Sequence, residues 1–265
     1  PDKTPFSDYG EIGWRGQNGL FIELHRDLFE NDSFDALPDF FDFQSLSTEE
    51  YPTHYGVPVT SMTPHDHFLY LLIHAYKHFV HSGFGIRQVC DIVLYANHYG
   101  SQVDWMQTLE NCRAIRAEKF AAALFQIGKN HLVFDPDEAS YPEAWRQIQV
   151  DETPMLEDLL SGGVYGDASM SRKHSSNITL DAVAAQKQGR KAKGSVVASV
   201  FPSAAKLEGR YPWLKKQPYL VPIAWADRMA AYLRETRSRS DSSLADALKI
   251  GNERLELLRR YEILK

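Results

Sequence analysis

The sequence predicts a mostly α-helical fold with a small β-sheet near its N-terminal end, and two observations carry this prediction. Residues 19–25 are apolar and β-prone and follow a turn signal, which is typical of a strand. From Pro64 onward, apolar residues recur with the period of an α-helix, and glycines and prolines interrupt them at helix-length intervals. The predicted class is therefore α+β with a large excess of helix.

In the predicted strand, alternate side chains face opposite sides of the sheet. One face carries the aliphatic residues Leu20, Ile22 and Leu24, and the other carries Phe21, Glu23 and His25. The following residues, 30–62, contain Pro38, Pro52 and Pro58 and are predicted to be mainly loop. A short strand or a helical turn is expected near residues 45–51.

Thr63 is a suitable N-cap for the first helix, because Pro64 follows at the first helical position and Asp66 lies in the first turn. Gly83 and Gly85 end that helix. Further helices are predicted at 86–98, 104–111, 114–132, 141–149, 154–161, 203–210, 222–237 and 243–261. The polar and basic stretch at 167–195 is predicted to be a mobile loop or a poorly packed helix with solvated charges.

The bulk composition is that of an ordinary soluble globular protein of one large domain or two small ones, with 265 residues, 43% hydrophobic and 24% charged. A net charge of −6 argues against a nucleic-acid binder that relies on bulk electrostatics, although a local basic groove stays compatible with it. No apolar run approaches the roughly 20 residues that span a bilayer, and the first residues do not form a signal peptide. Cys90 and Cys112 lack metal or disulfide spacing, so we expect free thiols and a cytoplasmic protein.

Glu23 lies in the middle of the predicted strand, where acidic residues are depleted. One interpretation is an edge strand with one solvated face. The other is a carboxylate that helps to bind Mg²⁺, which prefers oxygen ligands. His25 shares the face of Glu23 and would support the same site.

His74, Lys77 and His78 are spaced to share one face of the first helix. The two histidines have the spacing of a two-histidine metal site, but Ala75 stands where the zinc-peptidase motif has glutamate, and Lys77 would repel a metal ion. A lysine with flanking imidazoles is better suited to an anion such as a nucleotide phosphate. Histidines without any ligand are the alternative.

Arg87 and Asp91 are an i, i+4 pair on the next helix. They form either a simple intrahelical ion pair or a phosphate-binding arginine that Asp91 holds in place. The sequence contains no P-loop, no dinucleotide-binding glycine pattern and no nucleophile elbow.

Four blocks of sequence carry a resemblance to a known family. They are residues 22–28, residues 63–78 with their continuation 86–92, residues 161–166, and residues 211–214 with 220–228. In this order and spacing they resemble the uncharacterised bacterial nucleotidyltransferase-like proteins. That family is a divergent branch of the superfamily that contains DNA polymerase β-type and aminoglycoside nucleotidyltransferases.

The resemblance implies Mg²⁺-dependent transfer of a nucleoside monophosphate from an NTP to an unknown acceptor, with two Mg²⁺ ions held by three carboxylates. It implies that Glu23 is the third carboxylate, a catalytic residue and a metal ligand. The residues expected to bind the nucleotide phosphates are Lys77, Arg87, His74 and His78, with His25 and Asp91 in support. It also implies that residues 1–62 are part of a nucleotidyltransferase palm and that residues 63–265 form a helical domain.

The chain departs from the family pattern in one respect. The other two carboxylates of the superfamily come from an Asp-x-Asp shortly after a Gly-Ser turn, and this sequence has no such motif. Asp135 and Asp137 lack the preceding Gly-Ser, and the chain opens without Met in a polar stretch. We therefore expect the C-terminal portion of a longer enzyme, one half of a split enzyme or a degenerate homologue, which does not catalyse transfer by itself.

Two alternatives from other classes stay open. A metal-dependent phosphohydrolase of the His/Asp-rich helical type would use His65, His67, His74, His78 and Asp91. Its one adjacent His–Asp pair, His65 and Asp66, falls at a helix start, where an aspartate favours the helix dipole. A non-catalytic binding module would retain the fold without the chemistry, in agreement with the missing carboxylates.

Overall fold

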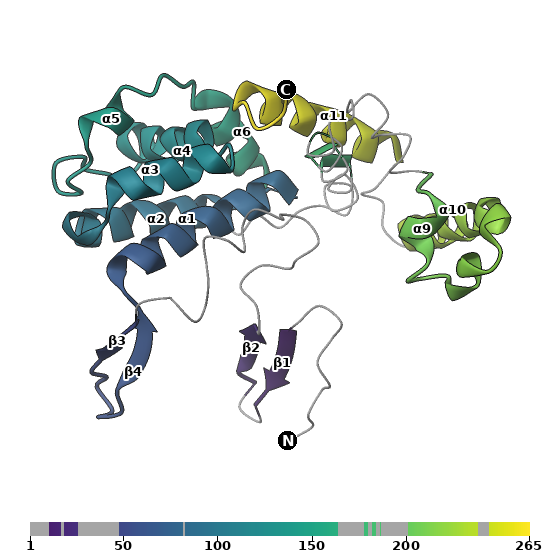
Figure 1. Cartoon of the computed structure of the whole chain (residues 1–265), viewed down its shortest axis with the longest axis horizontal. Coiled ribbons are helices and arrows are strands. Elements are labelled where there is room, and N and C mark those ends of the chain that lie inside the picture. The colour runs from purple at the N-terminus through teal and green to yellow at the C-terminus, as the bar shows by residue number, and fades with distance from the viewer. Residues whose placement is uncertain are drawn as a thin grey trace. The chain divides into compact units, whose positions relative to one another are not determined.

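The computed structural model describes residues 11–16, 19–25, 48–81, 83–163, 178–179, 182–183, 186, 201–237 and 244–265. Contacts within the chain divide it into two compact units, residues 1–48 and 49–265. The predicted fold class is confirmed, since the described residues are mainly helical and a small antiparallel sheet lies near the N-terminus (Figure 1).

The first unit contains a β-hairpin. β1 (Glu11–Arg15) pairs with β2 (Phe21–His25) in antiparallel orientation. β2 confirms the strand predicted at 19–25. β1 was not predicted, because Gly13 stands at its centre and glycine normally weakens a strand. A Cβ atom at Gly13 would lie 3.2 Å from the ring of Phe21, so glycine suits this close approach of the two strands.

A second two-stranded sheet precedes the helices and consists of β3 (Thr48–Tyr51) and β4 (Val59–Met62). Of the two conformations expected near residues 45–51, the structure has the strand. β4 falls in the region predicted to be loop, and its four residues are too few to show a period by themselves.

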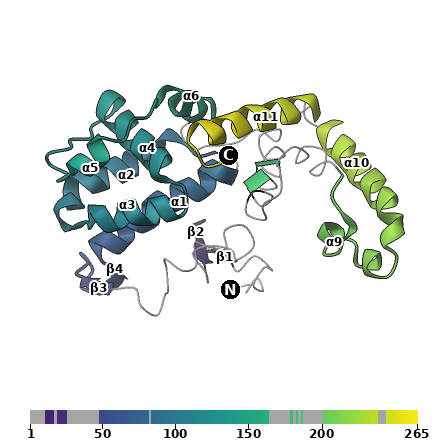
Figure 2. The ribbon, with the colours of Figure 1, turned by 45° about the horizontal axis from the view of Figure 1, so that its top comes forward.

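Most of the second unit is an assembly of helices. The helices up to Gly163 are α1 (Pro64–His81), α2 (Ile86–Tyr99), α3 (Trp105–Ala114), α4 (Glu118–His131), α5 (Glu143–Arg146) and α6 (Thr153–Ser161), with a 3₁₀ turn, η2 (Gly100–Gln102). The C-terminal helix α11 (Leu244–Arg260) lies beside α6 (Figures 1 and 2). The predicted helices are confirmed here, with ends shifted by a few residues.

The cap predicted for α1 is also confirmed. The Thr63 hydroxyl donates a 3.0 Å hydrogen bond to the Asp66 carboxylate, and the Asp66 N–H points back to the same hydroxyl at 3.5 Å. These contacts satisfy polar groups that the first helical turn would otherwise leave unpaired.

Buried aromatic side chains join the helices into one core. Phe68 of α1 packs edge-on against Trp105 of α3 at 5.0 Å between ring centroids, and Phe79 of α1 packs against Phe120 of α4, also at 5.0 Å. Tyr261, directly after α11, contacts Phe79 at 6.0 Å. Burial of such large apolar rings is the main source of stability in a helical assembly.

Residues 201–237 form a small cluster with its own core. It consists of α9 (Ala204–Leu207), the 3₁₀ turns η3 (Pro212–Lys215) and η4 (Pro218–Leu220), and α10 (Val221–Arg237). The core residues are Leu207, Tyr211, Leu214 and Ala224, with Val221 and Trp225 packed against them. The sequence placed a turn at 211–214, where η3 lies, and a helix at 222–237, which α10 confirms.

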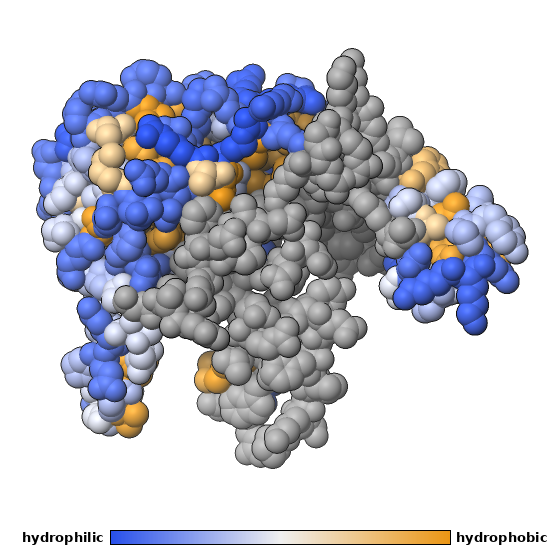
Figure 3. All heavy atoms as spheres, in the orientation of Figure 1, coloured by the Kyte–Doolittle hydropathy of each residue, from blue (hydrophilic) through white to orange (hydrophobic). Residues whose placement is uncertain are grey.

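The stretch predicted to be a polar mobile loop, 167–195, lies outside the described residues except at 178–179, 182–183 and 186, which are helical. Cys90 and Cys112 are free thiols, as predicted. No helix in the described ranges combines the length and the apolar character needed to cross a membrane. On the face shown in Figure 3, hydrophilic residues cover most of the coloured helical surface.

Candidate functional site

The predicted site residues fall in both units. Glu23 and His25 lie in β2 of the first unit, where the register places them opposite Gly13 and Glu11. The remaining five residues lie on α1 and α2 of the second unit.

His74 and His78 are brought together on α1. Their Nε2 atoms lie 3.0 Å apart, within hydrogen-bonding distance, and their rings meet at 73°. The ring of Tyr70 stacks on His74 at an interplanar angle of 9°. Lys77 is half-buried on the same helix. The spacing therefore produces the shared face that the sequence predicted, and an aromatic ring supports it.

The electrostatics of this face favour a neutral imidazole. Burial of the ring, followed by the positive charges of Lys77 and His81, lowers the pKa of His78 below its ordinary value of 6.5. A neutral ring has one N–H donor and one acceptor nitrogen, so it can share a proton with His74 at neutral pH. The Lys77 ammonium lies close enough to lower the pKa of His78, so this face carries a positive charge beside the histidine pair.

Arg87 and Asp91 form the predicted i, i+4 ion pair on α2, with Nε and Oδ2 3.8 Å apart. Their side chains are 62% and 54% exposed, so the pair contributes little to stability. Arg87 lies in the first turn of α2, which contains no acidic residue. The first turn of a helix carries a partial positive charge, so the guanidinium and the helix dipole act in the same direction on an anion.

The histidines of the phosphohydrolase alternative are engaged separately. His65 Nδ1 accepts a 3.2 Å hydrogen bond from the Asp104 N–H, and the ring of His67 packs on Tyr95 at 4.9 Å. Burial lowers the pKa of His67. In the ranges described by the structure, no group of three or more His, Cys, Asp or Glu residues could hold a metal ion.

Asp135 and Asp137, the one Asp-x-Asp sequence in the chain, stabilise a turn. The Asp135 carboxylate accepts hydrogen bonds from the N–H groups of Asp137 and Glu138 at 2.8 and 3.2 Å. Asp137 forms a 2.8 Å ion pair with Arg146. These contacts give both aspartates a structural role, in line with their interpretation as a turn.

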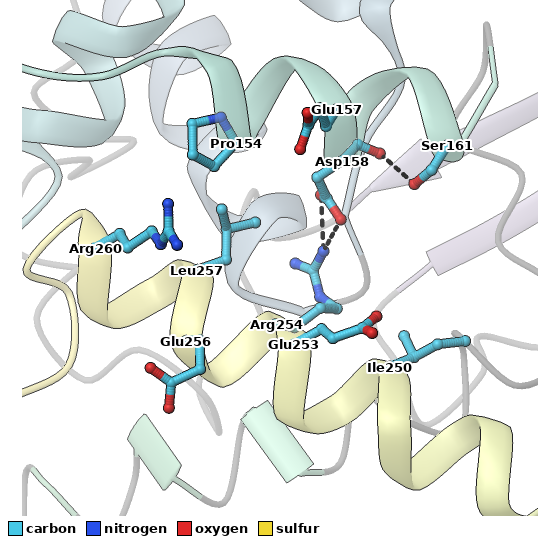
Figure 4. A pocket seen from close by; sticks show the side chains of 10 residues that line it. All are labelled: Pro154, Glu157, Asp158, Ser161, Ile250, Glu253, Arg254, Glu256, Leu257 and Arg260. Atoms are coloured by element: carbon cyan, nitrogen blue, oxygen red, sulfur yellow. Dashed lines mark hydrogen bonds and ion pairs between the residues drawn. The ribbon is translucent and has the colours of Figure 1, made fainter.

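The structure also shows a groove that sequence reasoning missed. It lies between α6 and α11, has a volume of about 740 Å³, and contains the Asp158–Arg254 ion pair (Figure 4). One nitrogen of Arg254 contacts both Asp158 oxygens at 2.9 and 3.0 Å, and the other donates to the carbonyl of Phe79. Arg254 is only 2% exposed, so the pair joins α11 to α6 and α1 from within.

A signal for this pair is present in the sequence. Arg254 is four residues from both Ile250 and Leu258, so it falls within the apolar stripe of α11. A cation in such a stripe needs a buried partner. The partner, Asp158, lies 96 residues earlier, and no local pattern identifies it.

The α1–α2 hairpin thus carries two cations and a contacting pair of imidazoles. Residues 3–132 match the model of a family described as uncharacterised nucleotidyltransferase. No curated protein and no solved structure matches the chain. The family resemblance found in the sequence is therefore confirmed, and nucleotide use follows from it in general terms.

Proposed function

We propose that the chain is the nucleotide-binding part of a nucleotidyltransferase that transfers a nucleoside monophosphate from an NTP to an acceptor. The observation that carries this proposal is the family match over residues 3–132. The matched region contains both β2, with Glu23, and the α1–α2 hairpin.

The hairpin residues have distinct roles in this proposal. Lys77 and Arg87 bind phosphate oxygens, Lys77 as a compact charge and Arg87 through its planar donor fork. Asp91, 3.8 Å from Arg87, orients that fork. The His74–His78 pair donates hydrogen bonds to the same phosphates in its neutral state, which the lowered pKa of His78 favours.

Glu23 is our proposed ligand for Mg²⁺, with His25 beside it on the strand face. Mg²⁺ takes an octahedral set of oxygen ligands, and one carboxylate supplies only part of it. Because the described residues contain no metal-holding group of three or more side chains, they do not form a magnesium site by themselves. We therefore assign no step of the transfer to a bound metal.

Nucleotide binding can be tested by titrating ATP, GTP, CTP and UTP into the full chain in the calorimeter. We expect at least one to bind, and we expect Lys77→Gln and Arg87→Gln each to weaken it about ten-fold, the usual value of a charged hydrogen bond. Lys129→Gln, which removes an exposed cation at the end of α4, is the matched control. Absence of binding by all four nucleotides, or an equal loss in the control, would contradict the proposal.

Catalysis is tested separately by measuring pyrophosphate release with Mg²⁺ and each NTP. The chain lacks the Gly-Ser and Asp-x-Asp motif, so we expect no turnover from the chain alone. Turnover that Glu23→Gln abolishes would overturn the expected inactivity and support the role of Glu23. Turnover that Glu23→Gln leaves unchanged would contradict both statements.

A further inference from the structure

The cluster formed by residues 201–237 is strongly basic, unlike the chain as a whole. It contains seven lysines and arginines and three acidic residues, whereas the complete chain has a net charge of −6. The family match ends at residue 132, so this basic character belongs to a part of the molecule outside the matched region. A local excess of positive charge within an acidic protein indicates an anionic partner.

Within this cluster, Tyr211 connects two arginines. Its hydroxyl donates a 2.7 Å hydrogen bond to the Asp227 carboxylate, and Arg210 lies over its ring, with Cζ 5.8 Å from the centroid. Arg228 follows Asp227 on α10 and is half-buried. Tyr211 thus holds Arg210 on its ring face and anchors, through Asp227, the turn of α10 that carries Arg228.

Neither arginine has a carboxylate partner in the part of the chain that the structure describes. Asp227, the residue before Arg228 in sequence, is engaged by the Tyr211 hydroxyl. Burial, followed by the positive charge of Arg210, lowers the pKa of the Arg228 guanidinium, so the two cations lie close enough to repel each other. Two such guanidinium groups, one of them half-buried, are stabilised when an anion lies between them.

The surroundings of the pair favour an anion with more than one charge. Lys215 and Lys216 are exposed at the end of η3, on the turn that follows Tyr211. Trp213, 38% exposed, packs against Tyr211 with ring centroids 5.7 Å apart. A phosphate group carries about two charges and accepts several hydrogen bonds, and the planar arginine fork matches its geometry.

We propose that Arg210 and Arg228 form a phosphate-binding site in the 201–237 cluster, separate from the nucleotide site on the α1–α2 hairpin. Its ligand is a compound that carries a phosphate or pyrophosphate group. The lysines of η3 reinforce the local positive field. The inference rests on the contacts of this cluster and does not depend on the function proposed for the hairpin.

Inorganic pyrophosphate is the probe that tests this site, titrated into the full-length Lys77→Gln/Arg87→Gln double variant, which lacks the hairpin cations. We expect pyrophosphate to bind this protein, and Arg228→Gln and Arg210→Gln added to it to weaken binding about ten-fold each. Arg228→Lys keeps the charge and loses the fork, so we expect an intermediate affinity. Lys129→Gln in the same background is the control and should have no effect.

Two results would overturn the proposal: no binding of pyrophosphate, or an equal affinity in the Arg228→Gln and Lys129→Gln proteins. Thermal unfolding of each variant shows whether a loss of binding reflects a loss of fold. Parallel titrations with ATP and with a thymidine octanucleotide distinguish the source of the phosphate. A small phosphorylated compound is indicated if only pyrophosphate and ATP bind, and a single strand if the octanucleotide binds more tightly and with a steep salt dependence.

Discussion

At the scale of single residues, the Asp158–Arg254 pair shows how one charge can hold three helices. Arg254 is almost fully buried and reaches both the Asp158 carboxylate and the Phe79 carbonyl. Its guanidinium also lies 5.7 Å from the centroid of the Phe79 ring. A buried cation of this kind stabilises the fold only while its partner carries a negative charge.

We therefore expect Asp158→Asn to lower the free energy of unfolding by about 3–5 kcal/mol, because it leaves the buried Arg254 without a counter-charge. Glu253→Gln is a matched control, since Glu253 and Lys249 form an exposed pair on the same helix, 3.9 Å apart. Urea unfolding measures the free energy of unfolding of both variants. A loss below about 1 kcal/mol in Asp158→Asn would show that the pair is not a structural element.

The lowered pKa of His78 predicts a dependence of stability on pH. Below the ordinary histidine pKa of about 6.5, the unfolded chain binds a proton at His78 that the folded chain does not bind. The contribution of this ring to stability is therefore complete above pH 6.5 and decreases as the pH falls toward the folded pKa.

Replacement by a side chain that does not titrate removes this contribution. We expect the free energy of unfolding of His78→Gln to fall less between pH 7 and pH 5 than that of the wild type. His54→Gln, at an exposed position before α1, is the control. Equal slopes for His78→Gln and the wild type would contradict the direction of the shift.

Part of the candidate site could be predicted from single residues and part could not. The shared face of His74 and His78 and the Arg87–Asp91 pair follow from helical spacing, and both are present. Arg210 and Arg228 were not singled out, because they come near each other only through the packing of Tyr211 against Asp227. Spacing within one helix is readable from sequence, whereas pairing between elements depends on tertiary packing.

At the scale of elements, the junction between α2 and η2 depends on a glycine. A Cβ atom at Gly100 would lie 2.1 Å from the carbonyl oxygen of Ala139, and the Gly100 carbonyl accepts a hydrogen bond from the Trp105 indole. The second acceptor of that indole is the Ala139 carbonyl itself. The backbone at Gly100 thus packs directly against the segment before α5.

We expect Gly100→Ala to destabilise the protein by about 1–3 kcal/mol, because the added methyl group must displace the Ala139 backbone. Gly209→Ala is the matched control, since nothing lies within 4 Å of a Cβ atom there. Thermal unfolding distinguishes the two. A Gly100→Ala protein as stable as the control would show that the backbones at Gly100 and Ala139 can separate without a loss of stability.

The long helices could be predicted from the sequence, whereas two of the short strands could not. The long helices α1, α2 and α4 have a clear 3.6-residue period, glycine boundaries or a cap, and they lie where the sequence placed them. β1 and β4 are short, and each exists because a neighbouring strand pairs with it. Such pairing is a non-local interaction that the composition of a four- or five-residue segment does not encode.

At the scale of the whole molecule, the matched family region and the folding unit do not coincide. The match ends at residue 132, after α4, but the core of α1–α4 continues into later helices. Trp145 of α5 contacts Phe125 at 5.9 Å, and Tyr261 contacts Phe79 at 6.0 Å. The indole of Trp145 also donates a 2.9 Å hydrogen bond to the Trp105 carbonyl.

Two truncations test where the folding unit begins and ends. A chain that stops at residue 132 exposes Phe79 and Phe125, and loss of a buried aromatic partner costs about 3–5 kcal/mol per site. Because a domain is stable by only about 5–15 kcal/mol, we expect this chain to show no cooperative thermal transition. A chain that starts at Glu49 keeps the second unit complete, and we expect its midpoint to stay within about 3 °C of the full chain.

Near-ultraviolet circular dichroism of the buried tryptophans provides the readout, because it reports fixed aromatic packing. A native-like spectrum for residues 1–132 would mean that the family region folds without α5, α6 and α11, and that the later contacts are an addition to a finished core. Loss of the spectrum in the chain starting at Glu49 would instead mean that the first 48 residues are needed to build the helical unit. The expected pair of results would place the α1–α2 hairpin in a folding unit that requires its last helix, α11, as well as its first helix, α1.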